Sequence, residues 1–342
     1  MRQGASGPSP PLLIVGPSWL GDAVMMGALV ERLKAAAPAR SLTVLTPAHL
    51  EPLVRRLPGV DATLINPFAH GALGIGRRVA FGRALKGRFG EAVVLPHSWK
   101  SALVPFFAGI ARRTGFVGEA RYGLLNDARR LDEKALPRMV DRFCLLAEPR
   151  GATAPRAAPA PRLDADATSA AATLARLGLD PAIAAVALCV GAEYGPAKRW
   201  PAAHFASLAR RLAQEGLASW IVGGPGDAAI GAEVARLAPG AALDLAGRTT
   251  MGEAIDLVAA ARVVVSNDSG LMHVAAALGR PLVALYGSTS PAFTPPLSDE
   301  AAILSEGLEC SPCFERVCPL GHLRCLNDLS PERVWAAVKA RL

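Results

Sequence analysis

The feature that most constrains this chain is a regular alternation of short apolar runs with longer amphipathic segments. In the first half, an apolar run at Leu12–Gly16 is followed by a polar loop and by helical periodicity from Ala23 to about Ala37. Further strands are predicted at residues 42–45, 62–65 and 92–95. Because strands that alternate with helices form parallel sheets covered on both faces, the pattern predicts an α/β fold.

The second half repeats the pattern. Its predicted strands are residues 184–189, 218–222, 262–266 and 282–286, with helices near 203–215 and 252–260. We therefore expect an N-terminal Rossmann-like domain at 1–150, a linker and start of the second domain at 151–180, a C-terminal Rossmann-like domain at 181–329 and a helix at 330–342. Ligands of such doubly wound sheets bind at the carboxyl ends of the strands, so the sequence predicts a cleft between the domains.

The stretch Val263–Gly279 combines a buried strand, a polar turn and a helix N-terminus, which is the arrangement of a phosphate site. The amides of Ser269, Gly270 and Leu271 are expected to face an anion at the positive end of the helix dipole. An ordinary turn capped by Asp268 or Ser269 needs the same residues, so both interpretations stay open.

Composition narrows the choice of partner. The net charge of +8 suggests acidic ligands, but aromatic residues make up 5% and no block of like charges occurs, which argues against nucleic acid. We expect anionic small molecules or an anionic membrane surface instead. No apolar run reaches the length of a membrane span, and the first eleven residues do not resemble a secretory signal, so a cytoplasmic location is expected.

Familiar nucleotide motifs are absent. The run Gly16–Gly21 has the two-glycine spacing of a Walker A loop, but Asp22 and Ala23 stand where lysine and serine or threonine are required. A carboxylate in that place reverses the charge needed to bind phosphate. Nucleotide hydrolysis at this loop is therefore not expected.

Five motifs together resemble glycosyltransferase family 9, the heptosyltransferases, from about Leu12 to Leu297. They are Gly16-Pro-Ser-Trp-Leu-Gly-Asp22, Pro96-His-Ser-Trp-Lys-Ser-Ala102, Arg113-Thr-Gly115 with Arg121-Tyr-Gly-Leu-Leu-Asn-Asp127, Gly191-Ala-Glu-Tyr-Gly-Pro-Ala-Lys-Arg-Trp-Pro201 and Ser266-Asn-Asp-Ser-Gly-Leu-Met-His273. The resemblance implies the GT-B architecture, which has two Rossmann-like domains.

The resemblance also implies a reaction. Heptose would pass from ADP-heptose to the first heptose of the lipopolysaccharide inner core, with inversion and without a required cofactor, at the inner face of the inner membrane. Two alternatives stay open. One is a family 9 transferase with another core acceptor, such as the enzyme that adds the first heptose. The other is a two-lobed solute-binding protein.

By resemblance, Asp22 matches the family's catalytic base, and its alternative role is a helix N-cap. Lys198, with Arg199 beside it, matches the phosphate-binding lysine, and the alternative is a solvated loop charge. Ser269, Gly270, Leu271 and His273 match the diphosphate cradle, although His273 could instead face the core. Asp268 could orient Lys198 or cap the helix.

Contacts to the nucleoside of the donor and to the acceptor are predicted less directly. Asp227 lies where the family contacts ribose, and Thr250 and Met251 lie where adenine is read, with a turn aspartate and a plain helix start as alternatives. For the acceptor, the candidate cations are Lys100, Arg113 and Arg121, with ordinary surface charge as the alternative.

Four cysteines stand close together near the end of the chain, at Cys310, Cys313, Cys318 and Cys325, with His322 among them. In a reducing compartment such a cluster more often holds a metal than forms disulfides. We expect a structural zinc ion first, then free or disulfide-paired thiols, then an iron–sulfur cluster. Family resemblance does not require these cysteines.

Overall fold

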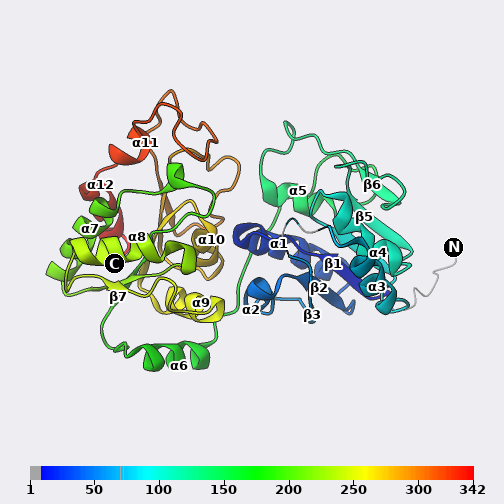
Figure 1. Cartoon of the computed structure of the whole chain (residues 1–342), viewed down its shortest axis with the longest axis horizontal. Helices are drawn as coiled ribbons and strands as arrows, with labels where there is room; N and C mark the ends of the chain where they lie inside the picture. The colour runs from blue at the N-terminus through cyan, green and yellow to red at the C-terminus, as the bar shows by residue number, and fades with distance from the viewer. Residues whose placement is uncertain (1–8, 70, 72) are drawn as a thin grey trace. The chain divides into compact units, whose positions relative to one another are not determined.

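The computed structural model describes residues 9–69, 71 and 73–342, and the chain divides into two compact units. The first unit ends at Pro161 and the second begins at Arg162, within the stretch 148–166 that has the composition of a linker. Figure 1 shows that each unit has helices packed around a set of strands. No helix in the described part of the chain is long and apolar enough to cross a membrane.

The first unit is built on a six-stranded parallel sheet in the order β3-β2-β1-β4-β5-β6. Its strands are β1 (Leu12–Val15), β2 (Leu42–Thr46), β3 (Ala62–Ile65), β4 (Glu91–Val94), β5 (Arg112–Phe116) and β6 (Asp127–Arg129). Its helices are α1 (Leu20–Ala36), α2 (Glu51–Val54), α3 (Ile75–Ala84), α4 (Leu103–Phe107) and α5 (Met139–Leu145).

The second unit is built on a six-stranded parallel sheet in the order β12-β11-β10-β7-β8-β9. Its strands are β7 (Ala185–Cys189), β8 (Ala218–Ile221), β9 (Leu243–Asp244), β10 (Val263–Asn267), β11 (Leu282–Leu285) and β12 (Ala301–Leu304). Its helices are α6 (Ala167–Leu177), α7 (Ala202–Gln214), α8 (Ala228–Leu237), α9 (Met251–Ala260), α10 (Gly270–Ala277), α11 (Arg324–Asn327) and α12 (Pro331–Lys339).

Counted from the start of each unit, the two sheets have the same strand order, 3-2-1-4-5-6. The order reverses between β1 and β4 in the first unit and between β7 and β10 in the second. The central strands are fully buried because both faces are covered, which explains their continuous apolar runs. Ligand sites of this fold lie at the carboxyl ends of strands beside the reversal.

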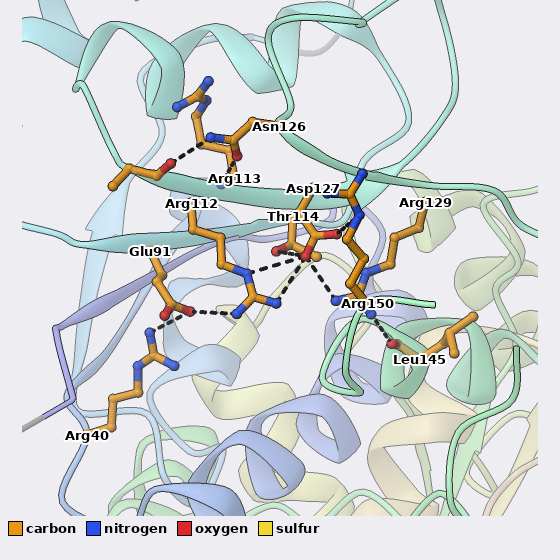
Figure 2. Close-up of polar contacts among 11 residues, drawn as sticks. Arg40, Glu91, Arg112, Arg113, Thr114, Asn126, Asp127, Arg129, Leu145 and Arg150 are labelled. Carbon is orange, nitrogen blue, oxygen red and sulfur yellow. Dashed lines mark hydrogen bonds and ion pairs between the residues drawn. The ribbon is translucent and has the colours of Figure 1, made fainter. Parts of the chain in front are cut away.

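A network of ion pairs lies at the amino-terminal ends of β5 and β6, the ends opposite to those where ligands of this fold bind (Figure 2). Asp127 accepts a hydrogen bond of 3.1 Å from each of three side chains, those of Arg112, Thr114 and Arg129. Arg150 lies 3.9 Å from its other oxygen. Burial alone would raise the pKa of Asp127, but the hydrogen bonds from Arg129, Arg112 and Thr114 outweigh it and lower the pKa.

Candidate functional site

The turn between β10 and α10 presents amide groups that can bind an anion. Ser269 is the N-cap residue of α10, yet its side chain does not cap the helix and its Oγ lies 3.2 Å from Ser266 Oγ. No residue in the described part of the chain accepts a hydrogen bond from the amides of Gly270 and Leu271. These amides lie at the positive end of the helix dipole, as the anion-site interpretation requires.

Lys198 is held beside this turn by a buried ion pair. It ends the 3-10 helix η3 (Pro196–Lys198), and its Nζ lies 2.6 Å from Oδ2 of Asp268. The two side chains are only 13% and 4% exposed, and Thr289 Oγ1 donates a second hydrogen bond to the same carboxylate oxygen. Of the two roles open for Asp268, the structure shows that it orients Lys198. An ammonium has three donors, so Lys198 retains donor capacity for a ligand oxygen.

Asn267, the last residue of β10, fixes the loop that carries Lys198. Its Oδ1 accepts a hydrogen bond of 3.0 Å from the amide of Trp200, and its Nδ2 donates one of 2.8 Å to the carbonyl of Val190. The side chain is fully buried, so the two ends of this loop are tied to the strand beside it. The sequence pattern assigned Asn267 only to the turn and missed Thr289. The residues to which each of them hydrogen-bonds are distant in sequence, so no local pattern indicates the contacts.

His273 lies one turn into α10 and is buried. Burial lowers its pKa to about 4, with the charge of Asp268 acting against this effect and that of Lys198 adding to it. The ring is therefore neutral at pH 7. The charged groups that act on the ring are Asp268 and Lys198, the two members of the ion pair.

Asp227 and Arg199 lie near the carboxyl ends of β7 and β8. Asp227 ends the 3-10 helix η4 (Pro225–Asp227), and its Oδ2 accepts a hydrogen bond of 3.0 Å from the amide of Gly224. Burial raises the pKa of Asp227, while this hydrogen bond and the charge of Arg199 lower it. Gly191 packs directly below, since a Cβ there would stand 2.1 Å from the carboxyl carbon of Asp227. The carboxylate of Asp227 therefore occupies the space that a side chain at position 191 would take.

Thr250 performs a structural role at the start of α9. Its Oγ1 accepts a hydrogen bond of 3.3 Å from the amide of Glu253, and Glu253 Oε2 accepts one of 2.8 Å from the amide of Thr250. This reciprocal pair is a capping box, which is the helix-start alternative for Thr250. Met251 is the first residue of α9 and is half-buried.

Asp22 lies in the first turn of α1, after β1. The helix begins at Leu20 rather than at Ala23, the N-cap residue is Trp19, and no side chain caps this end. The N-cap alternative for Asp22 is therefore wrong. Burial raises the pKa of Asp22 to about 6, and no ion pair or hydrogen bond to its carboxylate is found in the described part of the chain. An ionised but poorly solvated carboxylate of this kind is suited to accept a proton near neutral pH.

The structure places Arg121 in the interior, contrary to the expectation of a cation on a loop surface. The residue is 1% exposed and donates hydrogen bonds to the carbonyls of Phe116 and Pro96 and to Ser101 Oγ at 3.4 Å. Desolvation lowers its pKa to about 10, so the guanidinium stays charged. Its donors hold the segment that carries Lys100, and direct contact with an acceptor is excluded by its burial.

Arg113 is also engaged within its own unit, in a position visible in Figure 2. Its Nε donates to the carbonyl of Leu124 at 2.6 Å, and its Nη1 donates to that of Ile110 at 2.5 Å. Lys100 differs, because it is half-buried in the 3-10 helix η2 (Trp99–Ala102) and its ammonium makes no ion pair with a described residue. Of the three predicted acceptor cations, Lys100 is the one that the geometry leaves available.

The four clustered cysteines surround one small cavity of about 20 Å³. Cys310, Cys313, Cys318 and Cys325 are all half-buried free thiols, and His322 also lines the cavity. As they stand in the described part of the chain, no three or more histidine, cysteine, aspartate or glutamate side chains are grouped so that they could hold a metal ion. The amide of Leu323, together with those of Leu320, Gly321 and His322, donates to the sulfur of Cys318 and lowers its pKa; these contributors are backbone groups of one tight turn.

Comparisons with known proteins agree on one family. Residues 78–324 match the family model of glycosyltransferase family 9 (heptosyltransferase). The chain is 43% identical to lipopolysaccharide heptosyltransferase 2 of Escherichia coli K12, over 97% of this chain and 98% of that protein. The solved structure of E. coli ADP-heptose lps heptosyltransferase II matches with a TM-score of 0.86 at 40% identity, covering 96% and 98% of the two chains. Lipopolysaccharide heptosyltransferase 1 of Pseudomonas aeruginosa is 33% identical, over 42% of this chain and 44% of that protein.

Proposed function

Because the chain belongs to glycosyltransferase family 9, we propose that it transfers heptose from ADP-heptose to the first heptose of the lipopolysaccharide inner core. It is a glycosyltransferase of GT-B architecture, with two Rossmann-like units. The likeness to heptosyltransferase 2 extends over nearly the whole chain, whereas that to heptosyltransferase 1 covers less than half of it. This difference favours the second heptose addition over the first.

The observation that carries the proposal is the buried Lys198–Asp268 pair beside the open amides of α10. Lysine and amides placed together can bind the diphosphate of ADP-heptose and stabilise the charge that grows on it as the sugar leaves. Asp227 is proposed to accept hydrogen bonds from the ribose hydroxyls, with Arg199 near the phosphates and Met251 near adenine. His273, neutral at pH 7, can donate one hydrogen bond to a phosphate oxygen.

In the proposed reaction, the acceptor hydroxyl attacks the anomeric carbon of heptose from the face opposite the leaving group. A new carbon–oxygen bond forms as the bond to the β-phosphate oxygen breaks, and that oxygen keeps the electron pair. The hydroxyl proton goes to the carboxylate of Asp22, whose pKa of about 6 leaves it ionised at pH 7 and more basic than an ordinary aspartate. Lys100 is proposed to pair with an anionic group of the acceptor.

Turnover assays with two acceptors test the proposal. Purified protein is given ADP-heptose with either a Kdo2-lipid A acceptor that carries one heptose or one that carries none, and products are analysed by mass spectrometry. We expect addition to the heptose-bearing acceptor alone. Transfer to the acceptor without heptose would instead assign the first addition, and absence of turnover with both would overturn a heptosyltransferase function.

The place of action is also proposed. The acceptor is anchored in a membrane and the chain has a formal net charge of +8, so peripheral binding to the anionic inner face of the inner membrane is expected, with the protein otherwise in the cytoplasm. Sedimentation with vesicles that contain anionic lipid, compared with neutral vesicles, tests this part of the proposal.

A structural metal ion bound by the four clustered cysteines is also proposed. The cysteine cavity has room for about one water-sized occupant, and Ser288, which lines it, is 2% exposed with an Oγ that has no hydrogen-bond partner in the described residues. Thiolates at this spacing prefer zinc, which would stabilise the fold and take no part in the transfer. Metal analysis of protein purified under reducing conditions should find about one zinc per chain.

A further inference from the structure

The segment that carries the four cysteines, residues 307–325, lies directly on the loop that carries Lys198, residues 190–199. We name these the cysteine segment and the lysine loop. The carbonyl of Arg316 accepts a hydrogen bond of 3.0 Å from the amide of Ala197, and the carbonyl of Phe314 accepts one of 2.5 Å from Tyr194 Oη. The Tyr194 ring is also contacted by two cations, Arg316 at 5.2 Å and Lys198 Nζ at 5.0 Å. The phosphate-site lysine and the cysteine segment therefore share one aromatic ring.

The cysteine segment also contacts the stretch that supports Asp268. Ser311 Oγ donates to the carbonyl of Gly287 at 2.5 Å, and the amide of Phe314 donates to the carbonyl of Ser288 at 2.7 Å. The next residue, Thr289, donates to Asp268. Both members of the Lys198–Asp268 pair are thus supported by loops that hydrogen-bond to the same segment.

Apart from these contacts to neighbouring loops, the cysteine segment has little regular structure of its own. Residues 305–323 contain no helix or strand, and the large apolar side chains of Phe314, Val317 and Leu320 are exposed rather than packed in a core. A loop of this kind has low local stability unless another interaction closes it. The four thiols around one cavity are the group in the segment that can provide that closure.

We propose that a metal ion held by Cys310, Cys313, Cys318 and Cys325 positions the lysine loop, so that binding of the nucleotide diphosphate depends on the metal. This inference rests on the proposed function, because it takes Lys198 as the diphosphate ligand. The cysteines act through Tyr194 and Ala197, which are positioning residues. The dependence assigns the metal a role in substrate affinity beyond the stability of its own loop.

Metal removal is the first test. ADP binding to the full chain is measured by calorimetry under reducing conditions, before chelation, after chelation and after zinc is restored. We expect the Kd for ADP to rise at least about tenfold on chelation and to recover with zinc, while far-ultraviolet circular dichroism shows that the chain stays folded. An unchanged Kd in folded, metal-free protein overturns the inference.

Gly195→Ala tests the same contact without removing a thiol. A Cβ at Gly195 would stand 2.4 Å from the carbonyl oxygen of Arg316, so the substitution forces the two segments apart. We expect normal zinc content, weaker ADP binding and a raised KM for ADP-heptose with a smaller change in kcat. Gly76→Ala is the matched control, because its new methyl group meets open space in α3. Wild-type ADP affinity in the Gly195→Ala protein overturns the inference.

The two hypotheses fail in different ways. If zinc-loaded wild-type protein does not bind ADP, this result contradicts both the proposed function and the inference that rests on it. ADP binding that is equal with and without zinc contradicts the inference alone and leaves the proposed function standing. Zinc content below about 0.2 per chain in reduced protein that binds ADP normally also overturns the inference alone.

Discussion

The two units share one sheet order but place opposite charges at the point where that order reverses. After the first strand of the first unit comes a half-buried carboxylate, Asp22, without an ion-pair partner in the described residues. After the first strand of the second unit comes an ammonium, Lys198, which a buried carboxylate orients. The fold therefore determines where a ligand can bind, and the residues after the strands determine which charge it meets.

Arginines hold loops together in both units. In the first unit, Arg113 and Arg121 donate to backbone carbonyls and hold loops together. In the second unit, Arg199 likewise donates to the carbonyl of Ala192 at 3.3 Å, and the side-chain amide of Asn267 joins the two ends of the same loop. A cation in a family motif can thus stabilise the loops of a site through hydrogen bonds to backbone carbonyls, without contacting the ligand.

The largest expected effect comes from Asp22→Asn in the first unit. The variant keeps the shape of the side chain but cannot take the acceptor proton, so kcat should fall by roughly 10² to 10⁴ with ADP affinity unchanged. Single-turnover kinetics and ADP calorimetry measure the two quantities. A variant that keeps more than about a tenth of wild-type kcat would remove Asp22 as the base.

The pH dependence of Asp22 gives a second way to test this contrast. Because its pKa is about 6, kcat/KM should rise about tenfold per pH unit below 6 and level off above it, and this pH dependence should vanish in Asp22→Asn.

The raised pKa of Asp22 means that the folded protein binds the proton more tightly than the unfolded chain. The associated stability is present below the ordinary value of 3.8 and is lost as pH rises to about 6, which corresponds to about 3 kcal/mol at neutral pH. Asp22→Asn should therefore unfold at a higher urea concentration than wild type at pH 7.

Lys198→Ala should give the next largest effect and should fall on the donor side alone. Loss of one charged donor at the diphosphate is expected to reduce kcat/KM for ADP-heptose by roughly 10² to 10³, with the KM for the acceptor unchanged. Initial-rate kinetics in both substrates provide the measurement. Lys86→Ala, at an exposed position after α3, is the control. A selective change in acceptor KM would contradict the assignment of Lys198.

Arg121→Met tests the supporting role of arginine in the first unit. It removes the buried donors to the carbonyl of Phe116, while the carbonyl of Pro96 keeps a hydrogen bond from Ser101 Oγ, so we expect a loss of roughly 1 to 3 kcal/mol in unfolding free energy. Urea denaturation measures the loss, with the exposed Arg77→Met as control. Full stability together with a raised acceptor KM would return Arg121 to the acceptor site.

Asp127→Asn should produce the smallest effect, and one that depends on pH. The lowered pKa of Asp127 means that its contribution is present at pH values above the unfolded value and is lost as pH falls through the folded value. The variant should therefore be less stable than wild type at pH 7, and the difference should shrink below about pH 4. Thermal melts across this range measure it, and a difference that grows on acidification would contradict the network of Figure 2.

Sequence patterns predicted the fold well where strands are apolar and poorly where they are not. The two doubly wound parallel sheets and the glycosyltransferase family are confirmed. The pattern missed β5, β6, β9 and β12. Strand β5 reads Arg-Arg-Thr-Gly-Phe, and its polar start is explained by the arginines that hydrogen-bond at the sheet edge, a tertiary effect that no local window contains.

For the site, local sequence placed the residues but did not assign their partners. The turn after β10 and Lys198 were found from the strand–turn–helix pattern and from resemblance, and their roles stay predictions. The orienting contact of Asp268, the donation from Thr289 and the bridging amide of Asn267 depend on pairs separated by 21 to 77 positions. Helix starts were also shifted, since α1 includes Leu20, Gly21 and Asp22.

The two glycines at the ends of the Gly191–Gly195 stretch limit how this enzyme can be redesigned. A Cβ at Gly191 would meet the carboxylate of Asp227, and one at Gly195 would meet the carbonyl of Arg316, so a side chain at either position forces its neighbour to shift. Of the three residues between them, Ala192 is buried and Tyr194 is engaged by its hydroxyl. A library meant to change nucleotide preference should therefore leave both glycines fixed and place its diversity at Glu193, which is exposed.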